Sequence, residues 1–523
     1  MNTSAVDAQQ RATIEQGYGQ LGPYDVEVTD GIDIEADDGV LLRGTLALPV
    51  GLGRVPAVLL RTPYPVAYFT GEVITWASHG YACLIQSTRT TTSYFDETRD
   101  GPAAVRWIER QPWFDGRLGL TGLSYLAFTS WATASTRPAS LKAIATGIYS
   151  TDRVSSWYPG GGFGLELALT WAANQQADGA ETGTDPYDHL PLCEADVAAT
   201  GATLDFYQER LAFDGDDPHW QSLNFAHLLD DPPAPVLHID GWHDYHRIYV
   251  WQDFERLNRN GRSLPHRFVI GPWSHAGIDL KEMMAEKLAW FERHVRGEGS
   301  LHAGSLRYYR TGVAAEWREL DAWQEPERIS LYAAADGSLA TAPGESRGRA
   351  QWTYDPAHPT PSVELTALGT GEIGGVVDNS AYESRSDVLT FTGAPLEADL
   401  DLAGHVSALA TFSSDAPSAD LFLRLVDVYE DGRVQHVADG FVRITDSDLG
   451  WGVPVEVDLG PVGHRFGAGH RLRLLIASGA HPYHNRNLGN GEPTGTATRI
   501  RVAHQGVDVG GETGLLISLP LAR

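Results

Sequence analysis

Short apolar segments separated by stretches of helix length fill much of the N-terminal half of the chain, and this alternation constrains the fold most. The first segments are VPAVLLRTPY (55–64), YACLIQST (81–88), GRLGLTGLSY (116–125) and LKAIATGIY (141–149). Each is aliphatic and too short for a buried helix, which is typical of strands covered on both faces. Such strands, alternating with helices, form a parallel sheet, so the sequence predicts an α/β domain.

The same pattern stops and later resumes. PVLHIDGWHD (235–244) and HRFVIGPWSH (266–275) are two further strands of this kind, with a helix-like segment between them. The intervening residues, 151–231, hold a glycine cluster and several helical stretches, which indicates a helical cap inserted into the sheet domain. Residues 25–50 alternate apolar and polar side chains around Asp-Gly turns, as antiparallel strands do. We therefore predict a catalytic domain at 22–150 and 232–317, with the cap at 151–231.

The helical periodicity ends after a last predicted helix at 282–296. From there to residue 523 the chain shows short alternating strands with regular Gly, Pro and Asp punctuation. This pattern favours an all-β sandwich of the jelly-roll type, predicted at 318–523. The length of 523 residues fits such a division, because single domains usually hold about 100–200 residues.

Charge and composition exclude several classes of function. The chain has 39 basic and 68 acidic residues, for a formal net charge of −29, which disfavours binding to nucleic acid or anionic lipid. No apolar run is long enough to cross a bilayer. Cys83 and Cys193 are too few for a disulfide framework, and residues 1–20 lack the apolar core of a signal peptide. We predict a cytoplasmic protein with no nucleic-acid or membrane partner; a homodimer is left open.

The strongest local motif is LGLTGLSYLAFTSWATA, in which an apolar strand runs through Gly122 and Ser124 directly into a helix-like segment. A turn this sharp lifts a serine hydroxyl off the edge of a sheet, as in a nucleophile elbow. The amide of Tyr125, at the start of the helix, can then face a developing oxyanion. Leu126 stands where the common hydrolase pattern has glycine, so a serine that merely caps a buried helix is the alternative.

Partners for Ser124 follow in the chain order of α/β-hydrolases, which is serine, acid, histidine. Asp244 and His275 each close a predicted strand, where open α/β sheets place their ligands. A serine is a poor nucleophile at neutral pH, so it needs an imidazole as base and a buried carboxylate to orient that imidazole. The sequence therefore predicts a triad of Ser124, Asp244 and His275.

Two alternatives concern the segment around residue 244. Asp240 is the rival acid, and Asp244 is preferred because Gly241 is expected to break the strand before it. A metal site is the other alternative, for which the candidate ligands are Asp240, His243, Asp244 and His246. His243 and His246 lack a second well-spaced ligand group, so we predict no metal and no cofactor.

Several motifs in one order carry a family resemblance over nearly the whole chain. They are RTPY (61–64), AVRWIERQPWFDGRLGLTGLSYL (104–126), YPGGG (158–162), GWHD (241–244), GPWSH (271–275), ESRSDVLTF (383–391), LRLVDVYEDGR (423–433) and GHRLRLLIASGAHPYHNRN (469–487). Together they resemble the cocaine esterase and X-prolyl dipeptidyl-peptidase family of serine hydrolases. The resemblance implies an α/β-hydrolase domain, a helical cap and a C-terminal jelly roll. It also implies that the Tyr64 hydroxyl joins the Tyr125 amide in an oxyanion hole.

The chain departs from the family near the expected site. Residues 86–93, QSTRTTTS, lack the acid and the glycines usual there, and Ala127 replaces a glycine. These departures leave the acyl group of the substrate open.

The leading reading is a serine hydrolase that cleaves a small-molecule ester or amide through an acyl-enzyme. An acyltransferase that uses the same intermediate is an alternative. An X-prolyl dipeptidyl peptidase is another, and it would need cap carboxylates to hold a substrate ammonium. The candidates for that role are Glu166, Asp178, Glu194 and Asp196. A carbohydrate-binding protein with an inactive hydrolase domain is the alternative outside the enzymes.

Overall fold

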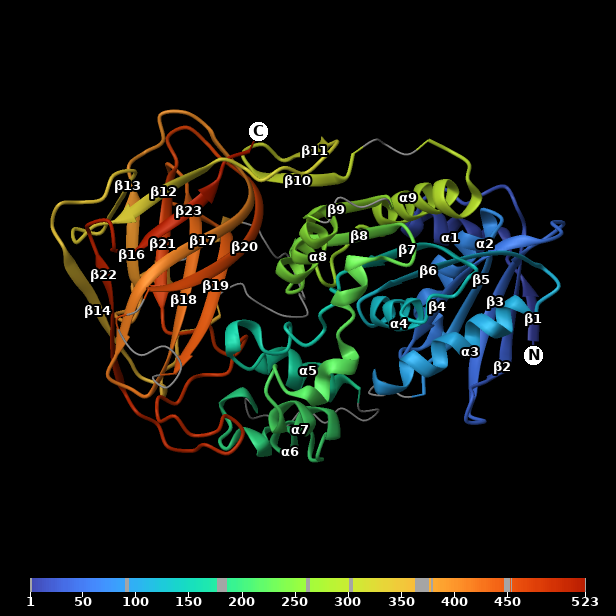
Figure 1. The fold of residues 1–523 in the computed structure, drawn as a ribbon, viewed down its shortest axis with the longest axis horizontal. Coiled ribbons are helices and arrows are strands. Elements are labelled where there is room, and N and C mark those ends of the chain that lie inside the picture. The colour runs from blue at the N-terminus through green and yellow to red at the C-terminus, as the bar shows by residue number, and fades with distance from the viewer. Residues whose placement is uncertain are drawn as a thin grey trace.

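The computed structural model describes residues 2–89, 94–175, 186–259, 264–300, 304–362, 376–377, 380–445, 452 and 454–522. An α/β body stands at one end of the molecule and a β-sandwich at the other (Figure 1). Helices α5 (Leu165–Asn174), α6 (Ala195–Thr200) and α7 (Asp205–Ala212) lie between them, on one side.

The α/β body is built on one sheet whose centre is parallel. Its strands are β1 (Asn2–Ala5), β2 (Val26–Glu35), β3 (Leu41–Pro49), β4 (Val55–Thr62), β5 (Ala82–Ser87), β6 (Phe114–Leu123), β7 (Leu141–Gly147), β8 (Val236–His243), β9 (His266–Ser274), β10 (Leu306–Gly312) and β11 (Glu316–Leu320). They pair in the order β1-β2-β3-β5-β4-β6-β7-β8-β9-β10-β11. The run β5-β4-β6-β7-β8-β9-β10 is parallel throughout. The six strands predicted from the sequence, β4 to β9, are all present.

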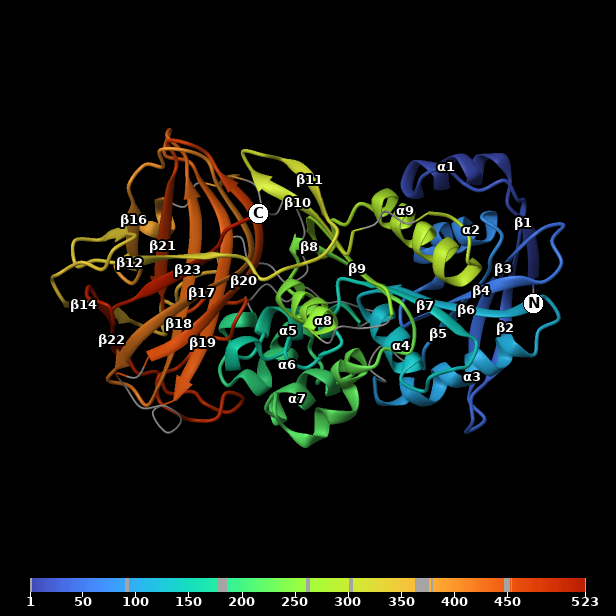
Figure 2. The same cartoon turned by 45° about the horizontal axis from the view of Figure 1, so that its top comes forward.

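Helices cover both faces of this sheet. The helices of one face are α1 (Ala8–Tyr18), α2 (Thr70–Ser78) and α9 (Leu280–Phe291), and those of the other are α3 (Glu97–Glu109) and α4 (Tyr125–Ala134) (Figure 2). Successive residues of β4 enter the two cores: Leu60 packs with Trp76 of α2, and Leu59 packs with Phe128 of α4. Burial on both faces explains why these strands are continuously apolar instead of alternating.

The remaining helices are short or flank the sheet. Helix α8 (Arg247–Arg259) connects β8 to β9. The others are η1 (Val66–Phe69), η2 (Tyr94–Asp96), η3 (Pro159–Gly161), η4 (Pro186–Asp188), η5 (Leu192–Glu194), η6 (Pro218–Leu223), η7 (Ala226–Asp230), η8 (Glu292–Arg296) and α10 (Ser380–Glu383). No helix among the residues placed by the structure is long and apolar enough to cross a membrane.

The first twenty residues contain elements that the sequence did not reveal. Strand β1 pairs antiparallel with β2, and α1 begins at a capping box formed by Asp7 and Gln10. None of the α1 residues is buried, so the helix has no apolar stripe by which periodicity would identify it. The predicted start of the catalytic domain at residue 22 therefore leaves out a strand of the same sheet.

The cap helices form a small core of their own, in which Phe163, Leu169 and Tyr207 are buried. Helix α6 ends at Gly201, whose φ of 76° lies in the left-handed region that glycine tolerates. The cap also contacts the C-terminal region, since the Glu166 amide donates to the Pro482 carbonyl over 3.1 Å.

The C-terminal region is a sandwich of two sheets. Its strands are β12 (Arg328–Ala333), β13 (Ser338–Ala340), β14 (Gly348–Tyr354), β15 (Val376–Val377), β16 (Leu389–Gly393), β17 (Leu400–Ser414), β18 (Ser418–Val428), β19 (Val434–Thr445), β20 (Pro454–Phe466), β21 (Arg471–Ala477), β22 (Ala503–Val509) and β23 (Leu516–Pro520). One layer has the order β12-β23-β17-β20, and the other has β16-β21-β18-β19. Leu402 of β17 and Leu474 of β21 meet in the core between them.

Strand β10 joins the two bodies. Leu306 to Tyr308 pair with β9, and Thr311 and Gly312 pair with β20 of the sandwich. The predicted boundary between residues 317 and 318 falls inside β11. The predicted architecture, an α/β domain with inserted helices followed by an all-β domain, is confirmed.

Candidate active site

Ser124 lies in a strained turn between β6 and α4. Its φ of 53° and ψ of −123° are rare for a residue with a side chain, and such strain persists where the surrounding structure enforces it. Gly122 makes the turn feasible, because a Cβ there would lie 2.4 Å from the Leu126 Cβ. The glycine missing at position 126 is therefore not required: Leu126 packs over Gly122, and the strand and helix still approach closely.

The structure brings Ser124, His275 and Asp244 together at the carboxyl ends of β6, β9 and β8. The His275 Nε2 is 3.0 Å from the Ser124 Oγ, and its Nδ1 is 2.6 Å from the Asp244 Oδ2. The Asp244 side chain is fully buried, whereas that of His275 is 11% exposed. An ionised carboxylate only accepts hydrogen bonds, so this geometry favours the tautomer that donates from Nδ1 and accepts at Nε2.

Asp240, the rival acid, is buried behind this contact. Its Oδ1 accepts a hydrogen bond from the Gly241 amide over 2.7 Å. Burial and the neighbouring Asp244 charge raise the pKa of Asp240 well above its usual range, which favours the neutral form. The expected role of Gly241 is wrong: β8 continues through it to His243. A Cβ at Gly241 would lie 2.1 Å from the Trp273 carbonyl oxygen, so glycine is needed there for close packing.

The possible metal ligands do not gather. Among the described residues, no group of three or more His, Cys, Asp and Glu side chains is placed to hold a metal ion. Burial lowers the pKa of His243 to about 3. The His246 Nε2 faces the Arg153 guanidinium at 3.4 Å, and Asp244 is engaged by His275.

Tyr64 follows β4 and lies near the start of α4. Its ring meets that of Tyr125 edge to face, with centroids 6.5 Å apart. The Trp171 Nε1 donates to the Tyr64 hydroxyl over 3.2 Å, which leaves the phenolic proton available for another acceptor. Burial raises the pKa of Tyr64 to about 12, so the group remains a donor at neutral pH. Tyr125 is the first residue of α4, where backbone amides lack intrahelical acceptors.

An aromatic cluster extends from the elbow into the cap. The Tyr94 ring lies 4.6 Å from that of Tyr125 and is stacked on Phe206 at 5.2 Å. Trp157 and Trp171 complete the cluster, with centroids 5.7 and 6.2 Å from Tyr94. Rings from both the catalytic domain and the cap therefore pack together beside the elbow.

Two buried arginines in this cluster were not predicted. Arg153 follows β7, and Arg210 lies on α7, with 5% and 1% of their surfaces exposed. Arg210 stands four residues after Phe206, so both lie on the same helix face, and this spacing was the available signal. Nothing in the sequence near Arg153 indicated its burial.

The carboxylates proposed for an ammonium site are not assembled into one. Asp196 is fully buried, and its carboxylate accepts from the Leu204 amide and the Gln208 side chain. Glu194 lies 3.7 Å from His189, and its side chain is largely exposed. Glu166 is half-buried in the first turn of α5. Asp178 lies outside the described residues, as do residues 90–93 of the altered 86–93 loop.

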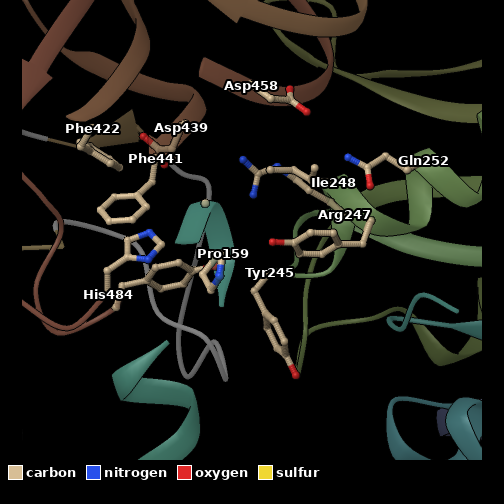
Figure 3. Close-up of a pocket in the computed structure, with 14 residues that line it drawn as sticks. Pro159, Tyr245, Arg247, Ile248, Gln252, Phe422, Asp439, Phe441, Asp458 and His484 are labelled. Atoms are coloured by element: carbon tan, nitrogen blue, oxygen red, sulfur yellow. The ribbon is translucent and has the colours of Figure 1, made fainter. Parts of the chain in front are cut away.

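A cavity of about 200 Å³ lies where the catalytic domain, the cap and the sandwich meet. Figure 3 shows Phe441 and His484 on its sandwich side and Arg247 and Gln252 on its α8 side. Tyr245 also lines it, and the Tyr245 ring packs on His275 with centroids 4.8 Å apart. Tyr245 therefore connects the cavity to His275.

Comparisons with known proteins agree with this architecture. Residues 38–277 match the family model described as X-Pro dipeptidyl-peptidase (S15 family). Residues 302–513 match the model of the X-Pro dipeptidyl-peptidase C-terminal non-catalytic domain.

Individual relatives cover nearly the whole chain. Cocaine esterase from Rhodococcus sp. (strain MB1 Bresler) is 28% identical over 536 aligned residues, covering 89% of this chain and 93% of that protein. An aminopeptidase from the marine sediment archaeon Thaumarchaeota archaeon has a TM-score of 0.83 at 22% identity, covering 95% and 96% of the two chains. An α-amino acid ester hydrolase has a TM-score of 0.83 at 21% identity, covering 96% and 97%.

Proposed function

Because the chain belongs to the S15 family of serine hydrolases, we propose that it hydrolyses an ester or amide of a small molecule through an acyl-enzyme on Ser124. The observation that carries this proposal is the connected pair of contacts from Ser124 to His275 and from His275 to Asp244. This arrangement is what a serine needs to act as a nucleophile near neutral pH.

In the acylation step the Ser124 Oγ forms a bond to the substrate carbonyl carbon while His275 takes the hydroxyl proton. The carbon–oxygen or carbon–nitrogen bond then breaks, and His275 returns the proton to the departing alcohol or amine. In deacylation a water oxygen bonds to the acyl carbon while His275 takes the water proton. The bond between the acyl carbon and the Ser124 Oγ then breaks, and His275 returns the proton to that oxygen as the acid leaves. Asp244 holds the imidazole and stabilises its protonated form in both steps.

The negative charge that develops on the carbonyl oxygen requires donors that are already in position. The Tyr64 hydroxyl and the Tyr125 amide are the proposed donors. Trp171 supports this role, because its bond to the Tyr64 oxygen orients the phenol and leaves its proton free to donate.

Labelling with a fluorophosphonate tests the proposal without knowledge of the substrate. We expect one adduct per chain on the peptide that contains Ser124, formed as the serine oxygen bonds to phosphorus and fluoride leaves. Ser124→Ala and heat-denatured protein are the controls and should remain unlabelled. A native protein that does not react, or that reacts at another serine, would contradict the proposed nucleophile.

Tyr64→Phe should lower kcat by about 10²–10³, the usual loss for one oxyanion donor. The ring keeps its packing, so KM should change little, because the lost bond strengthens only in the transition state. Steady-state kinetics on an activated ester would measure both constants.

Tyr68→Phe is the matched control, because Tyr68 belongs to the adjacent helix η1 and is 71% exposed. Its kinetics should equal those of the wild type. If Tyr64→Phe retained kcat within about threefold, the hydroxyl would have no part in the oxyanion hole.

A further inference from the structure

Among the described residues, the two buried arginines of the aromatic cluster have no carboxylate partner. The Arg210 Nε, Nη1 and Nη2 have no hydrogen-bond acceptor, and neither does the Arg153 Nε. Arg153 does bond to neutral groups, through Nη2 to the Tyr94 hydroxyl at 3.2 Å and Nη1 to His246. No ion pair connects either guanidinium to an acidic side chain within the described part of the chain.

Ring faces take the place of acceptors. The Arg210 Cζ lies 4.0 Å from the ring centroids of both Trp157 and Phe206. The Arg153 Cζ lies 4.9 Å from Trp157 and 4.9 Å from Tyr149. Both cations therefore border the same tryptophan, and their like charges repel each other in a poorly solvated region.

Two sets of contacts connect these cations to the proposed reaction centre. Tyr125, next to Ser124, packs against Tyr94 with the two rings tilted, and the Tyr94 hydroxyl accepts a hydrogen bond from Arg153. Trp171 donates to Tyr64 and lies 5.9 Å from the Arg210 guanidinium. The arginines thus lie at the cap end of the rings that begin at the elbow.

Burying two unpaired charges is energetically costly, and contact with aromatic rings compensates only in part. Burial, with a contribution from the Arg153 charge, lowers the pKa of Arg210 to about 9, so the group still carries its charge at neutral pH. If these positions served only to pack the cluster, apolar side chains in place of the arginines would make the fold more stable. Unsatisfied buried donors of this kind are explained by strain, by a water or an ion, or by a functional role such as binding a ligand that accepts from them.

We propose that the acyl group of the substrate ends in a carboxylate, which Arg210 and Arg153 bind while its scissile carbonyl lies at Ser124. This inference rests on the proposed hydrolase function and specifies its substrate class. A carboxylate matches the geometry of a guanidinium and can accept two of its hydrogen bonds at once. The same charges repel a substrate ammonium, which disfavours a dipeptidyl peptidase that captures a free amino terminus.

The test compares p-nitrophenyl half-esters of dicarboxylic acids, from succinate to adipate, with analogues whose terminal carboxylate is a primary amide. The two series have nearly the same shape and differ in charge. We expect kcat/KM for at least one chain length to favour the carboxylate by about tenfold or more, the usual effect of a charge-assisted hydrogen bond. A third series with a terminal ammonium should be the poorest. No preference for the carboxylate at any length would overturn the inference.

Arg210→Met should lower the ratio of kcat/KM for the carboxylate series to kcat/KM for the amide series by about tenfold or more. Arg210→Gln is the second variant, in case the methionine variant does not fold. Arg424→Met is the matched control, because Arg424 is also 1% exposed but is paired with Asp439 in the sandwich. It should keep the preference and lose thermal stability, whereas Arg210→Met should be at least as stable as the wild type.

The two proposals fail in different ways. A wild-type protein that neither reacts with the fluorophosphonate nor cleaves any ester would refute the hydrolase function. A protein that is labelled at Ser124 but retains its carboxylate preference in both folded Arg210 variants would refute only the assignment of the arginines.

Discussion

Ser124→Ala is expected to lower turnover by about six orders of magnitude, the loss typical of removing the nucleophile from a serine triad. Alanine keeps the Cβ and removes only the oxygen that His275 contacts at 3.0 Å. We expect no acyl-enzyme to form, because the Ser124 Oγ is the hydroxyl oxygen that His275 contacts. Rapid-mixing kinetics with an activated ester should show no burst of the leaving group.

Ser130→Ala is the control for this variant. Ser130 is buried on the same helix, α4, but its hydroxyl donates to the Leu126 carbonyl at 2.8 Å. Its loss should leave the burst and the turnover near wild-type values. Substantial turnover in correctly folded Ser124→Ala protein would show that the chemistry occurs elsewhere.

Asp244→Asn should lower kcat by about 10⁴, the effect known for the acid of a serine triad. The amide has nearly the shape of the carboxylate, so the fold should persist. Its NH₂ group, however, favours the imidazole tautomer with a bare Nδ1, which places the proton on Nε2 where the base is needed. Measuring kcat against pH would separate this loss from a change in binding.

Asp240→Asn provides a matched comparison, because the two acids lie four positions apart on the same segment. The raised pKa of Asp240 favours its neutral form, which asparagine resembles in shape and charge. We expect turnover within a few-fold of wild type and no loss of stability, since asparagine cannot ionise in this buried position. A large loss in Asp240→Asn with little effect in Asp244→Asn would make Asp240 the triad acid.

Local sequence patterns predicted the central sheet and the positions of the candidate triad. Strands buried on both faces are apolar throughout, so β4 to β9 were visible in the sequence. Since such strands run parallel, their carboxyl ends meet at one edge, and residues that end different strands were expected to lie close together. Ser124, Asp244 and His275 do so in the structure.

Elements without such a pattern were not predicted. Helix α1 has no fully buried residue, and β1 is too short to show an alternation, so their place in the catalytic domain was missed. Gly241 was expected to end its strand, because a glycine in a sequence does not show whether it serves a turn or close packing. Here the glycine serves close packing, because it leaves room for the carbonyl of Trp273 on the neighbouring strand β9.

The sequence by itself determined the class of the fold and the candidate residues Ser124, Asp244 and His275, since both depend on apolar strands and on the residue types that end them. Only the tertiary structure decided which acid contacts His275 and what surrounds the serine. Arg153 and Arg210 are 57 positions apart in the chain. They border one tryptophan because the cap folds back over the elbow. Whether an arginine is solvated or buried without a partner depends on which distant segments of the chain pack around it. The periodicity of the local sequence does not show those contacts.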